Sequence, residues 1–275
     1  MKKLEGKVAL VSGSGRGIGQ AIALKLAEEG ANIVINDLDE APAEETLVKV
    51  RKLARQAAVC IGDVTEVGFG EKFVKTAMEN FGGLDIIVNN AGYPWDSVIQ
   101  KMTDEQFQAM LDVHTVAPFR VLRAASGPIR EMAKKEKAKG KTVCRKVVNV
   151  SSIAGLYGNA GQMAYAAGKS SMIGMTRTLA KEWGRYNVNV NCVAFGLIET
   201  RMTQALDGEA KTASIGDHEI KMGIRPEMLK VMHQMIPLGR GGTPEEAAGA
   251  VYLFCSPESN YISGQVLLAG GGLIM

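Results

Sequence analysis

The sequence has few of the residues that build metal centres or disulfide frameworks. Its 275 residues include four cysteines without a Cys-x-x-Cys pair and three histidines without the spacing of a zinc site. We therefore expect reduced, buried thiols and no bound metal. No apolar run approaches the ~18 residues of a membrane-spanning helix, and residues 1–6 lack an apolar signal stretch. These absences favour a cytoplasmic protein without a membrane partner.

Positive charge is concentrated in one stretch of the chain. The net charge is +3, but residues 134–146 carry seven basic side chains and one acid, which leaves −3 for the remainder. Such a cluster could attract nucleic acid, an acidic carrier protein or coenzyme A phosphates. It falls between a predicted helix and the next strand, at the sheet edge opposite the one where ligands bind. We interpret it as a solvated surface insertion and expect no nucleic-acid partner.

Short apolar runs alternate with helical patterns along the whole chain. Thr103 and Thr243 are candidate helix caps, the second followed by Pro244 at the first helical position. This alternation predicts an α/β fold, a doubly wound parallel sheet of about seven strands with helices on both faces. No linker divides residues 1–275, so we expect a single domain. The strand-like runs are residues 7–11, 32–36, 57–61, 84–89, 146–150, 188–193 and 264–268.

A glycine-rich turn, Ser12-Gly13-Ser14-Gly15-Arg16-Gly17-Ile18-Gly19, joins the first strand to the first helix. Gly13 permits the tight turn, Gly17 lets the backbone approach a pyrophosphate, and Gly19 allows close helix–strand packing. A pyrophosphate would rest on the N–H groups at the helix start. The turn therefore predicts nucleotide binding.

A tyrosine and a lysine four residues apart form a candidate acid–base pair. Tyr165 and Lys169 share one face if their segment is helical, and Ser152 stands thirteen residues before the tyrosine. A cation beside the phenol would lower its pKa from an ordinary value near ~10. Acid–base catalysis is most efficient when the pKa lies near the working pH. Taken alone, the spacing also fits an ordinary surface helix.

Together these motifs resemble the classical branch of the short-chain dehydrogenase/reductase family over the whole chain. Three further segments carry the resemblance: Asp63-Val64, Asn89-Asn90-Ala91-Gly92 and Gly196-Leu197-Ile198-Glu199-Thr200. The resemblance implies a Rossmann-type fold and hydride transfer between nicotinamide and a carbonyl or secondary alcohol. It also implies a homotetramer, or a dimer, with the apolar tail 272–275 covered by a neighbouring subunit.

The resemblance also implies a role for each site residue. Tyr165 exchanges the hydroxyl proton, Lys169 lowers its pKa and binds the nicotinamide ribose, and Ser152 stabilises the substrate oxygen. Ser151 is the alternative candidate for the catalytic serine, but the spacing in the family favours Ser152. The implied cofactor contacts are Gly13, Ser14, Arg16, Gly17, Ile18, Gly19, Asp37, Leu38, Asp63, Val64, Asn90, Ala91, Gly92, Tyr165, Lys169, Gly196, Ile198 and Thr200.

Two positions depart from the family's pattern. His114 stands where the family usually has an asparagine that helps to hold a water of the proton relay. Pro118, four residues later, lacks an N–H and would leave the His114 carbonyl free at a kink. Our hypothesis is that this carbonyl keeps the relay water and the imidazole is secondary; an ordinary packed histidine is the alternative. Phe195 replaces a common proline and would add an apolar face near the nicotinamide.

The end of the second strand bears on the choice of cofactor. Asp37 can accept hydrogen bonds from the adenosine ribose and would repel a 2′-phosphate. Arg16 favours NADP instead, because a basic residue in the glycine turn often binds the 2′-phosphate in this family. Since an arginine can swing into solvent, we expect NAD, with NADP as the alternative.

The segment 197–238 is long and irregular, as is typical of a lid or a binding element. Its five methionines suit a mouldable apolar wall, or they pack a helical hairpin on the core. Residues 158–162 and 198–200 are closest to the β-ketoacyl reductase and 3-hydroxyacyl dehydrogenase group, which favours a 3-oxoacyl or 3-hydroxyacyl thioester or another apolar ketone. Cyclic alcohol, polyol and steroid dehydrogenases, and a non-catalytic subunit, remain alternatives.

Overall fold

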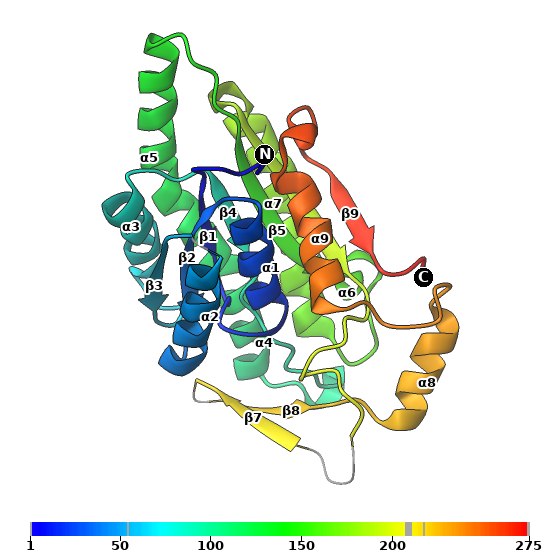
Figure 1. The fold of residues 1–275 in the computed structure, drawn as a ribbon. Coiled ribbons are helices and arrows are strands. Elements are labelled where there is room, and N and C mark those ends of the chain that lie inside the picture. The colour runs from blue at the N-terminus through cyan, green and yellow to red at the C-terminus, as the bar shows by residue number, and fades with distance from the viewer. Residues whose placement is uncertain (1, 54, 207–210, 217, 274–275) are drawn as a thin grey trace.

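Seven parallel strands form the central sheet in the part of the chain that the computed structural model describes, residues 2–53, 55–206, 211–216 and 218–273. The strand order is β3-β2-β1-β4-β5-β6-β9. Figure 1 shows β3 near one edge of the sheet and β9 at the other. The order reverses between β1 and β4, and ligands of doubly wound sheets bind at such a point, outside the carboxyl ends of the strands. The predicted α/β fold is confirmed. The strands are β1 (Val8–Val11), β2 (Asn32–Asp37), β3 (Ala57–Ile61), β4 (Ile86–Asn89), β5 (Arg145–Ser152), β6 (Val188–Phe195) and β9 (Val266–Ala269).

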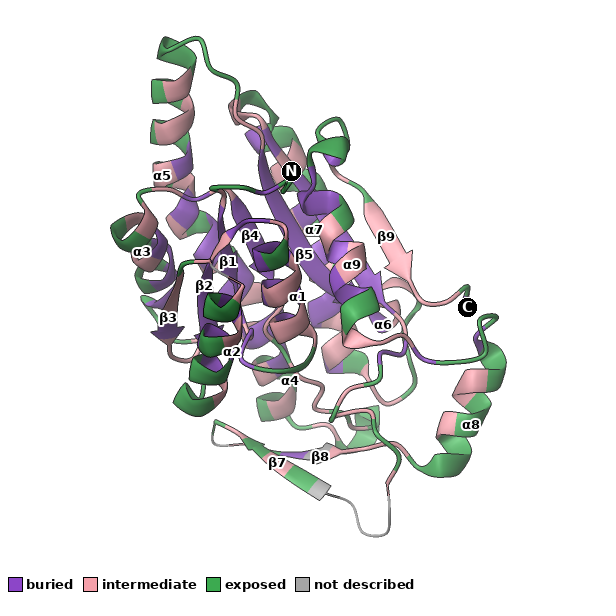
Figure 2. Ribbon diagram, in the orientation of Figure 1, coloured by how far each residue is buried: buried purple, intermediate pink, exposed green. Residues whose placement is uncertain are grey.

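Helices cover both faces of this sheet. One face packs against α1, α2 and α9, and the other against α3, α5 and α7. Residues alternate between the two cores along β1, with Ala9 and Val11 on one face and Val8 and Leu10 on the other. The central strands are therefore buried on both sides (Figure 2). The helices are α1 (Gly17–Glu28), α2 (Glu40–Lys52), α3 (Phe69–Phe81), α4 (Asp104–Leu111), α5 (Ala117–Ala138), α6 (Ile153–Tyr157), α7 (Met163–Trp183), α8 (Pro226–Met235) and α9 (Pro244–Cys255).

Two predicted helix starts are confirmed by their caps. Thr103 accepts a hydrogen bond from the backbone N–H of Gln106, and Thr243 from that of Glu246, each in a reciprocal capping box. Helix α4 then passes into α5 through the π-helical turn η2 (Asp112–Val116), next to Pro118. The irregularity expected at this proline is therefore present.

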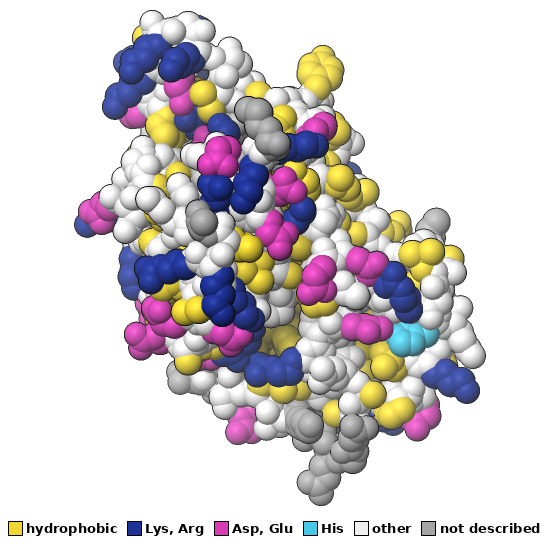
Figure 3. All heavy atoms as spheres, viewed as in Figure 1, with side chains coloured by type: hydrophobic (Ala, Val, Ile, Leu, Met, Phe, Trp, Pro, Cys, Tyr) yellow, Lys and Arg dark blue, Asp and Glu magenta, His cyan; other side chains and the backbone are white. Residues whose placement is uncertain are grey.

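The basic stretch 134–146 is only partly a solvated surface, so that prediction was wrong in part. Its five lysines are exposed at the end of α5, which projects from the molecule (Figure 3). Arg145 and Lys146, in contrast, are only 3% and 4% exposed. They begin β5, whose pairing with β4 and β6 places them inside the protein.

Both buried cations have polar partners. Arg145 forms a forked ion pair with Glu136 of α5, with N···O distances of 2.5 and 2.9 Å. Lys146 donates hydrogen bonds to Asn189 and Ser259. Buried charges require such partners. The Arg145–Glu136 pair joins the end of α5 to β5, and the Lys146 contacts join β5 to β6 and to Ser259.

The segment 197–238 contains a β-hairpin, so the alternative of a helical hairpin was wrong. Strands β7 (Lys211–Ile215) and β8 (His218–Met222) pair antiparallel, and α8 follows them. Leu229 and Met232 of α8, and Ile236 directly after it, pack towards Leu197 and Leu273. The last residues of the predicted covered tail, 274–275, lie outside the described part of the chain.

Within the described ranges, every helix is too short or too polar to cross a membrane. The same residues contain no group of three or more side chains placed to hold a metal ion. The four cysteines are free thiols.

Candidate active site

A cleft of about 1070 Å³ opens at the carboxyl edge of the sheet. The glycine turn, the loops after β2, β3 and β4, the ends of β5 and β6, and helix α7 surround it, and the β7–β8 hairpin contributes to its lining. Of the residues predicted from the sequence, the following line this cleft: Gly13, Arg16, Gly17, Ile18, Gly19, Asp37, Leu38, Asp63, Val64, Asn90, Ala91, Gly92, Ser152, Tyr165, Lys169, Gly196, Ile198 and Thr200.

The glycine turn has the shape that a dinucleotide pyrophosphate needs. A Cβ on Gly19 would lie 2.0 Å from the Gly13 carbonyl oxygen, and a Cβ on Gly13 would lie 2.8 Å from the Ala91 backbone. A Cβ on Gly17 would meet no described atom within 4 Å, so this position opens into the cleft at the start of α1. The turn thus leaves backbone N–H groups accessible at a helix N-terminus, where an anion binds favourably.

Hydrogen bonds fix this turn to the loop after β4. The Ser12 hydroxyl oxygen accepts from the backbone N–H groups of Asn90 and Ala91, each at 3.0 Å. The Asn90 side chain donates to the carbonyls of Ser12 and Gly13. Ser14, in contrast, is fully buried and donates to the Val11 carbonyl, so its hydroxyl is turned away from the cleft.

Two carboxylates stand where the adenosine end of a cofactor would lie. Asp37 Oδ2 accepts a hydrogen bond from the Gly15 N–H at 3.0 Å, and its Oδ1 accepts from the Asp39 N–H at 3.2 Å. Arg16 pairs with Asp39 at 2.8 Å. The arginine is therefore already partnered by a carboxylate, a feature that the sequence analysis missed.

A buried chain of polar side chains positions helix α7 on the sheet. Asn89 of β4 donates to Asn149 of β5, which donates to Thr176 of α7, both at 2.8 Å. The Ser151 hydroxyl donates to the Lys169 carbonyl, also at 2.8 Å. Ser151 and Ser152 both line the cleft, but Ser151 is only 2% exposed and its hydroxyl is engaged by the Lys169 carbonyl, so the geometry favours Ser152 as the substrate-facing serine.

Ser152, Tyr165 and Lys169 converge at the end of β5. The Lys169 Nζ donates to the Val150 carbonyl at 3.0 Å and lies 5.8 Å from the centre of the Tyr165 ring. The ammonium is thus aimed at a backbone oxygen, although both side chains share one face of α7 as predicted. Lys169 is only 5% exposed, so the lysine is deep in the site.

The predicted lowering of the tyrosine pKa by this lysine was wrong. Burial raises the pKa of Tyr165 to about 12, and hydrogen bonding by the Ser152 hydroxyl opposes that rise. Burial also lowers the pKa of Lys169 to about 8. Desolvation disfavours the charged form of both groups, and it is the largest cause of both shifts.

His114 lies behind the reacting groups rather than on the cleft wall. Its ring is 1% exposed and meets the Tyr165 ring edge-on, with centroids 5.1 Å apart. Burial, followed by the charge of Lys169, holds the pKa of His114 well below its ordinary value. The neutral ring donates from Nε2 to the Tyr93 carbonyl at 2.9 Å, while its buried Nδ1 has no partner among the described residues.

Two features of the cleft were not predicted from the sequence. His218 of the hairpin lines it and stacks on Trp95, and Arg201 lines it beside Thr200. An alternating pattern around Gly216-Asp217 would have signalled the hairpin, since a Gly-Asp pair is typical of two-residue turns. No local pattern pairs Trp95 with a histidine so distant in the sequence.

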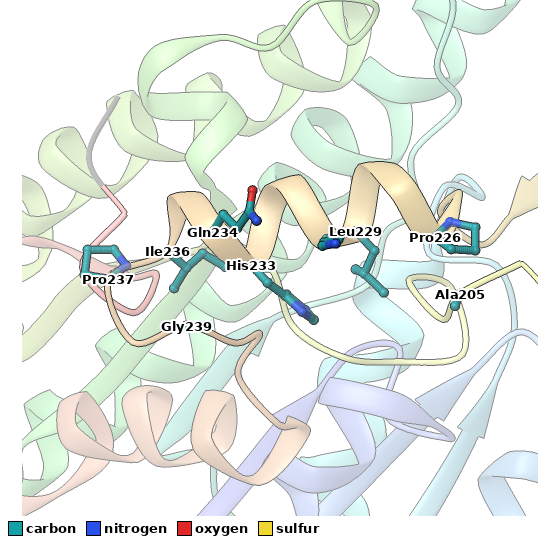
Figure 4. A pocket seen from close by; sticks show the side chains of 9 residues that line it. Ala205, Pro226, Leu229, His233, Gln234, Ile236, Pro237 and Gly239 are labelled. Atoms are coloured by element: carbon teal, nitrogen blue, oxygen red, sulfur yellow. The ribbon is translucent and has the colours of Figure 1, made fainter.

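A second cleft, of about 680 Å³, lies along α8 and is separate from the first. Leu229, His233 and Ile236 line it (Figure 4). His233 Nε2 is 3.7 Å from Glu199 Oε1. Because its lining shares no described residue with the first cleft, it is not part of the site that contains Tyr165.

Similarity to known proteins agrees with this geometry. A family model described as Enoyl-(Acyl carrier protein) reductase matches residues 13–274. The 3-oxoacyl-[acyl-carrier-protein] reductase FabG of Vibrio cholerae is 37% identical, over 99% of each chain. The enzyme of the same name from Thermotoga maritima is 34% identical, over 99% of this chain and 100% of its own. The chain belongs to the short-chain dehydrogenase/reductase family.

A solved structure agrees with this membership. A chain described as a candidate short-chain alcohol dehydrogenase from Sinorhizobium meliloti superposes with a TM-score of 0.83 at 30% identity, covering 98% of this chain and 97% of its own. As a family member, this protein is an oxidoreductase that uses a nicotinamide cofactor and acts on a carbonyl or secondary alcohol.

Proposed function

We propose that this short-chain dehydrogenase/reductase interconverts a 3-oxoacyl and a 3-hydroxyacyl thioester, with Ser152, Tyr165 and Lys169 as its catalytic residues. The observation that carries the proposal is the convergence of these three side chains in one cleft with the glycine turn. The names of the similar reductases support the substrate class. Phe195 and Ile198 supply apolar walls for an acyl group.

The residues divide the chemistry between them. A bound nicotinamide supplies or accepts the hydride. The Tyr165 Oη gives or takes the proton of the substrate hydroxyl, and the Ser152 hydroxyl donates to the substrate oxygen, where negative charge develops. Because burial raises the pKa of Tyr165 to about 12, the phenol carries the proton that carbonyl reduction requires. Lys169 keeps its ammonium on the Val150 carbonyl, 5.8 Å from the centre of the Tyr165 ring, and would bind the nicotinamide ribose.

The charge around the adenosine end supports NAD over NADP. A 2′-phosphate there would face Asp37 and Asp39, both lining the cleft. Arg16 is the nearest compensating cation, but Asp39 pairs with it at 2.8 Å, so two carboxylates stand against one arginine at this end of the cleft. Repulsion between close anions is costly, so we assign NAD as the preferred cofactor.

We also propose that the enzyme is a cytoplasmic homotetramer. Free cysteines support a reducing compartment. Exposed apolar side chains on the outer surfaces, including Phe119 of α5, Met163 of α7 and Leu253 of α9, support self-association. Size-exclusion chromatography with light scattering should give four times the chain mass of 29.3 kDa. A monomer at micromolar concentration would contradict this assembly.

The decisive experiment follows absorbance of the reduced nicotinamide during turnover. The panel contains 3-oxoacyl and 2-enoyl thioesters, cyclic and aliphatic alcohols, polyols and steroids, each with both cofactors. The enoyl thioester is included because the matching family model is described as an enoyl reductase. We expect turnover of the 3-oxoacyl thioester that disappears in Tyr165→Phe. Exclusive turnover of another class would overturn the substrate assignment, and silence with intact NAD binding would favour a non-catalytic subunit.

A further inference from the structure

The positively charged side chains that line the catalytic cleft differ in their partners. Arg16 is paired with Asp39, and the buried Lys169 donates to the Val150 carbonyl. Arg201 is the third cation on the described lining, and it is exposed. Within the described ranges it forms neither an ion pair nor a side-chain hydrogen bond, so its charge is available to a ligand.

Arg201 lies on the substrate side of the cleft. It follows Thr200 in the loop after β6, and the last residues of β6 and β5, Phe195 and Ser152, are paired in register. The loop itself is braced. The Thr203 hydroxyl donates to the Ile198 carbonyl at 2.6 Å and accepts from the Thr200 N–H at 2.8 Å. Arg201 therefore stands on a braced loop that follows β6, the strand paired with the one that ends in Ser152.

The other charged groups on the lining make Arg201 the favourable place for an anion. Carboxylates predominate among them, so an anionic substrate group would be repelled over much of the cleft. An anion that enters with the substrate has Arg201 as its available cation. These carboxylates are Asp37, Asp39, Glu45, Asp63, Glu105 and Asp112.

We propose that Arg201 binds the phosphate of a pantetheine arm that carries the acyl substrate. The assignment rests on the proposed thioester function. The planar guanidinium presents paired N–H donors that match a phosphate. An exposed position suits this role, because the arm separates its phosphate from the reacting carbonyl and places it towards the mouth of the cleft. Coenzyme A and an acyl carrier protein both present this phosphate.

The test compares two 3-oxobutanoyl thioesters that differ only in the phosphate, those of 4′-phosphopantetheine and pantetheine. In Arg201→Gln, the KM for the phosphorylated thioester should rise at least about tenfold, as expected for loss of a charge-assisted hydrogen bond. The KM for the pantetheine thioester and both kcat values should stay unchanged. Arg201→Lys should recover part of the loss. Arg225→Gln, at an exposed arginine outside the described lining of both clefts, is the matched control.

Thioesters of coenzyme A and of an acyl carrier protein then distinguish the two sources of the arm. Equal changes in KM for the 4′-phosphopantetheine and pantetheine thioesters in Arg201→Gln would overturn the assignment, and so would no change in either KM. Calorimetric binding of 4′-phosphopantetheine to the unchanged enzyme and to Arg201→Gln tests the contact without turnover. If neither thioester is turned over, the proposed function fails, while equal binding to the two proteins would separately refute the phosphate contact.

Discussion

The imidazole of His218 stacks on the indole of Trp95, with ring centroids 4.4 Å apart and planes inclined by 41°. This contact joins the β7–β8 hairpin to the loop after β4, and His218 lies on the wall of the catalytic cleft. Its Nδ1 also lies 3.8 Å from a carboxylate oxygen of Glu105. We infer that the stack holds the hairpin in place beside the substrate.

Removing the stack should weaken substrate binding. An aromatic pair contributes about 0.5–1.5 kcal/mol, so His218→Ala should raise KM by up to about tenfold with little change in kcat. His218→Phe keeps a ring but loses the contact with Glu105, and it should restore most of the affinity. Steady-state kinetics measure both variants, and a change in Trp95 fluorescence reports whether the hairpin has moved. Equal KM values for His218→Ala and the unchanged enzyme would refute the role.

The buried lysine should give stability a distinctive pH dependence. The pKa of Lys169 is about 8 in the folded protein and 10.5 as its reference value, so the unfolded state binds more protons between these values. The free energy of unfolding attributable to this lysine should therefore rise with pH from 8 to 10, by at most about 1.4 kcal/mol per pH unit. Tyr165, with its raised pKa, acts in the opposite direction only above pH 10.

Lys169→Met supplies the reference for that measurement. Denaturant unfolding of both proteins at several pH values gives the difference in the free energy of unfolding, in which the contributions of other titrating groups largely cancel. Below pH 8 the difference should be flat, because both states carry the proton. A flat difference up to pH 10 would mean that the folded-state pKa is not lowered.

Neutralising one carboxylate should relax the cofactor preference. Asp37→Ser removes the charge that would face a 2′-phosphate and leaves Arg16, whose exposed ion pair with Asp39 contributes only about 0.2–1 kcal/mol. We expect the ratio of kcat/KM for NAD to that for NADP to fall by at least about tenfold. Asp104→Ser, at the start of α4 and outside the cleft lining, is the control. An unchanged ratio would place cofactor selection elsewhere.

His114→Ala tests the role of the His114 imidazole separately from that of its backbone carbonyl. The imidazole touches Tyr165 from behind and has its Nε2 on the Tyr93 carbonyl, so its loss should destabilise the fold by about 1–3 kcal/mol. Turnover should persist if the backbone carbonyl holds the relay water. Thermal unfolding and kinetics on the same sample distinguish the two effects. A collapse of turnover in a folded, NAD-binding variant would show that the imidazole itself is needed.

The ion pair between Glu136 of α5 and Arg145 of β5 should contribute to the free energy of unfolding and leave kcat and KM unchanged. Glu136→Gln leaves the buried Arg145 without its carboxylate; because Glu136 is itself 23% exposed, the loss should be smaller than the about 3–5 kcal/mol that breaking a fully buried pair costs. The exposed Glu131 on the same helix is the control, because Glu131→Gln removes an equal charge without uncovering a buried partner. Urea unfolding should separate the two variants. Similar midpoints for both would refute the importance of the pair.

The parts of the site that were predictable depend on local sequence. Gly13 and Gly19 pack too closely against backbone to tolerate a side chain, and Thr103 caps a helix through a neighbour three residues away. Such local requirements can be predicted from the residue types and their spacing. The burial of Arg145 and the direction of the Lys169 ammonium depend on strands and carbonyls distant in the sequence. The charge pattern of residues 134–146 and the four-residue spacing of Tyr165 and Lys169 therefore do not predict the tertiary environment of these side chains.

The cationic end of α5 and the mouth of the cleft lie at opposite edges of the sheet, since Arg145 begins β5 and Ser152 ends it. A sulfonated chromatography bead should therefore hold the protein by its lysine-rich projection. The chain would be immobilised in one preferred orientation, with its catalytic opening facing the mobile phase. Adsorption to such a bead offers a way to fix the enzyme on a support without chemical coupling.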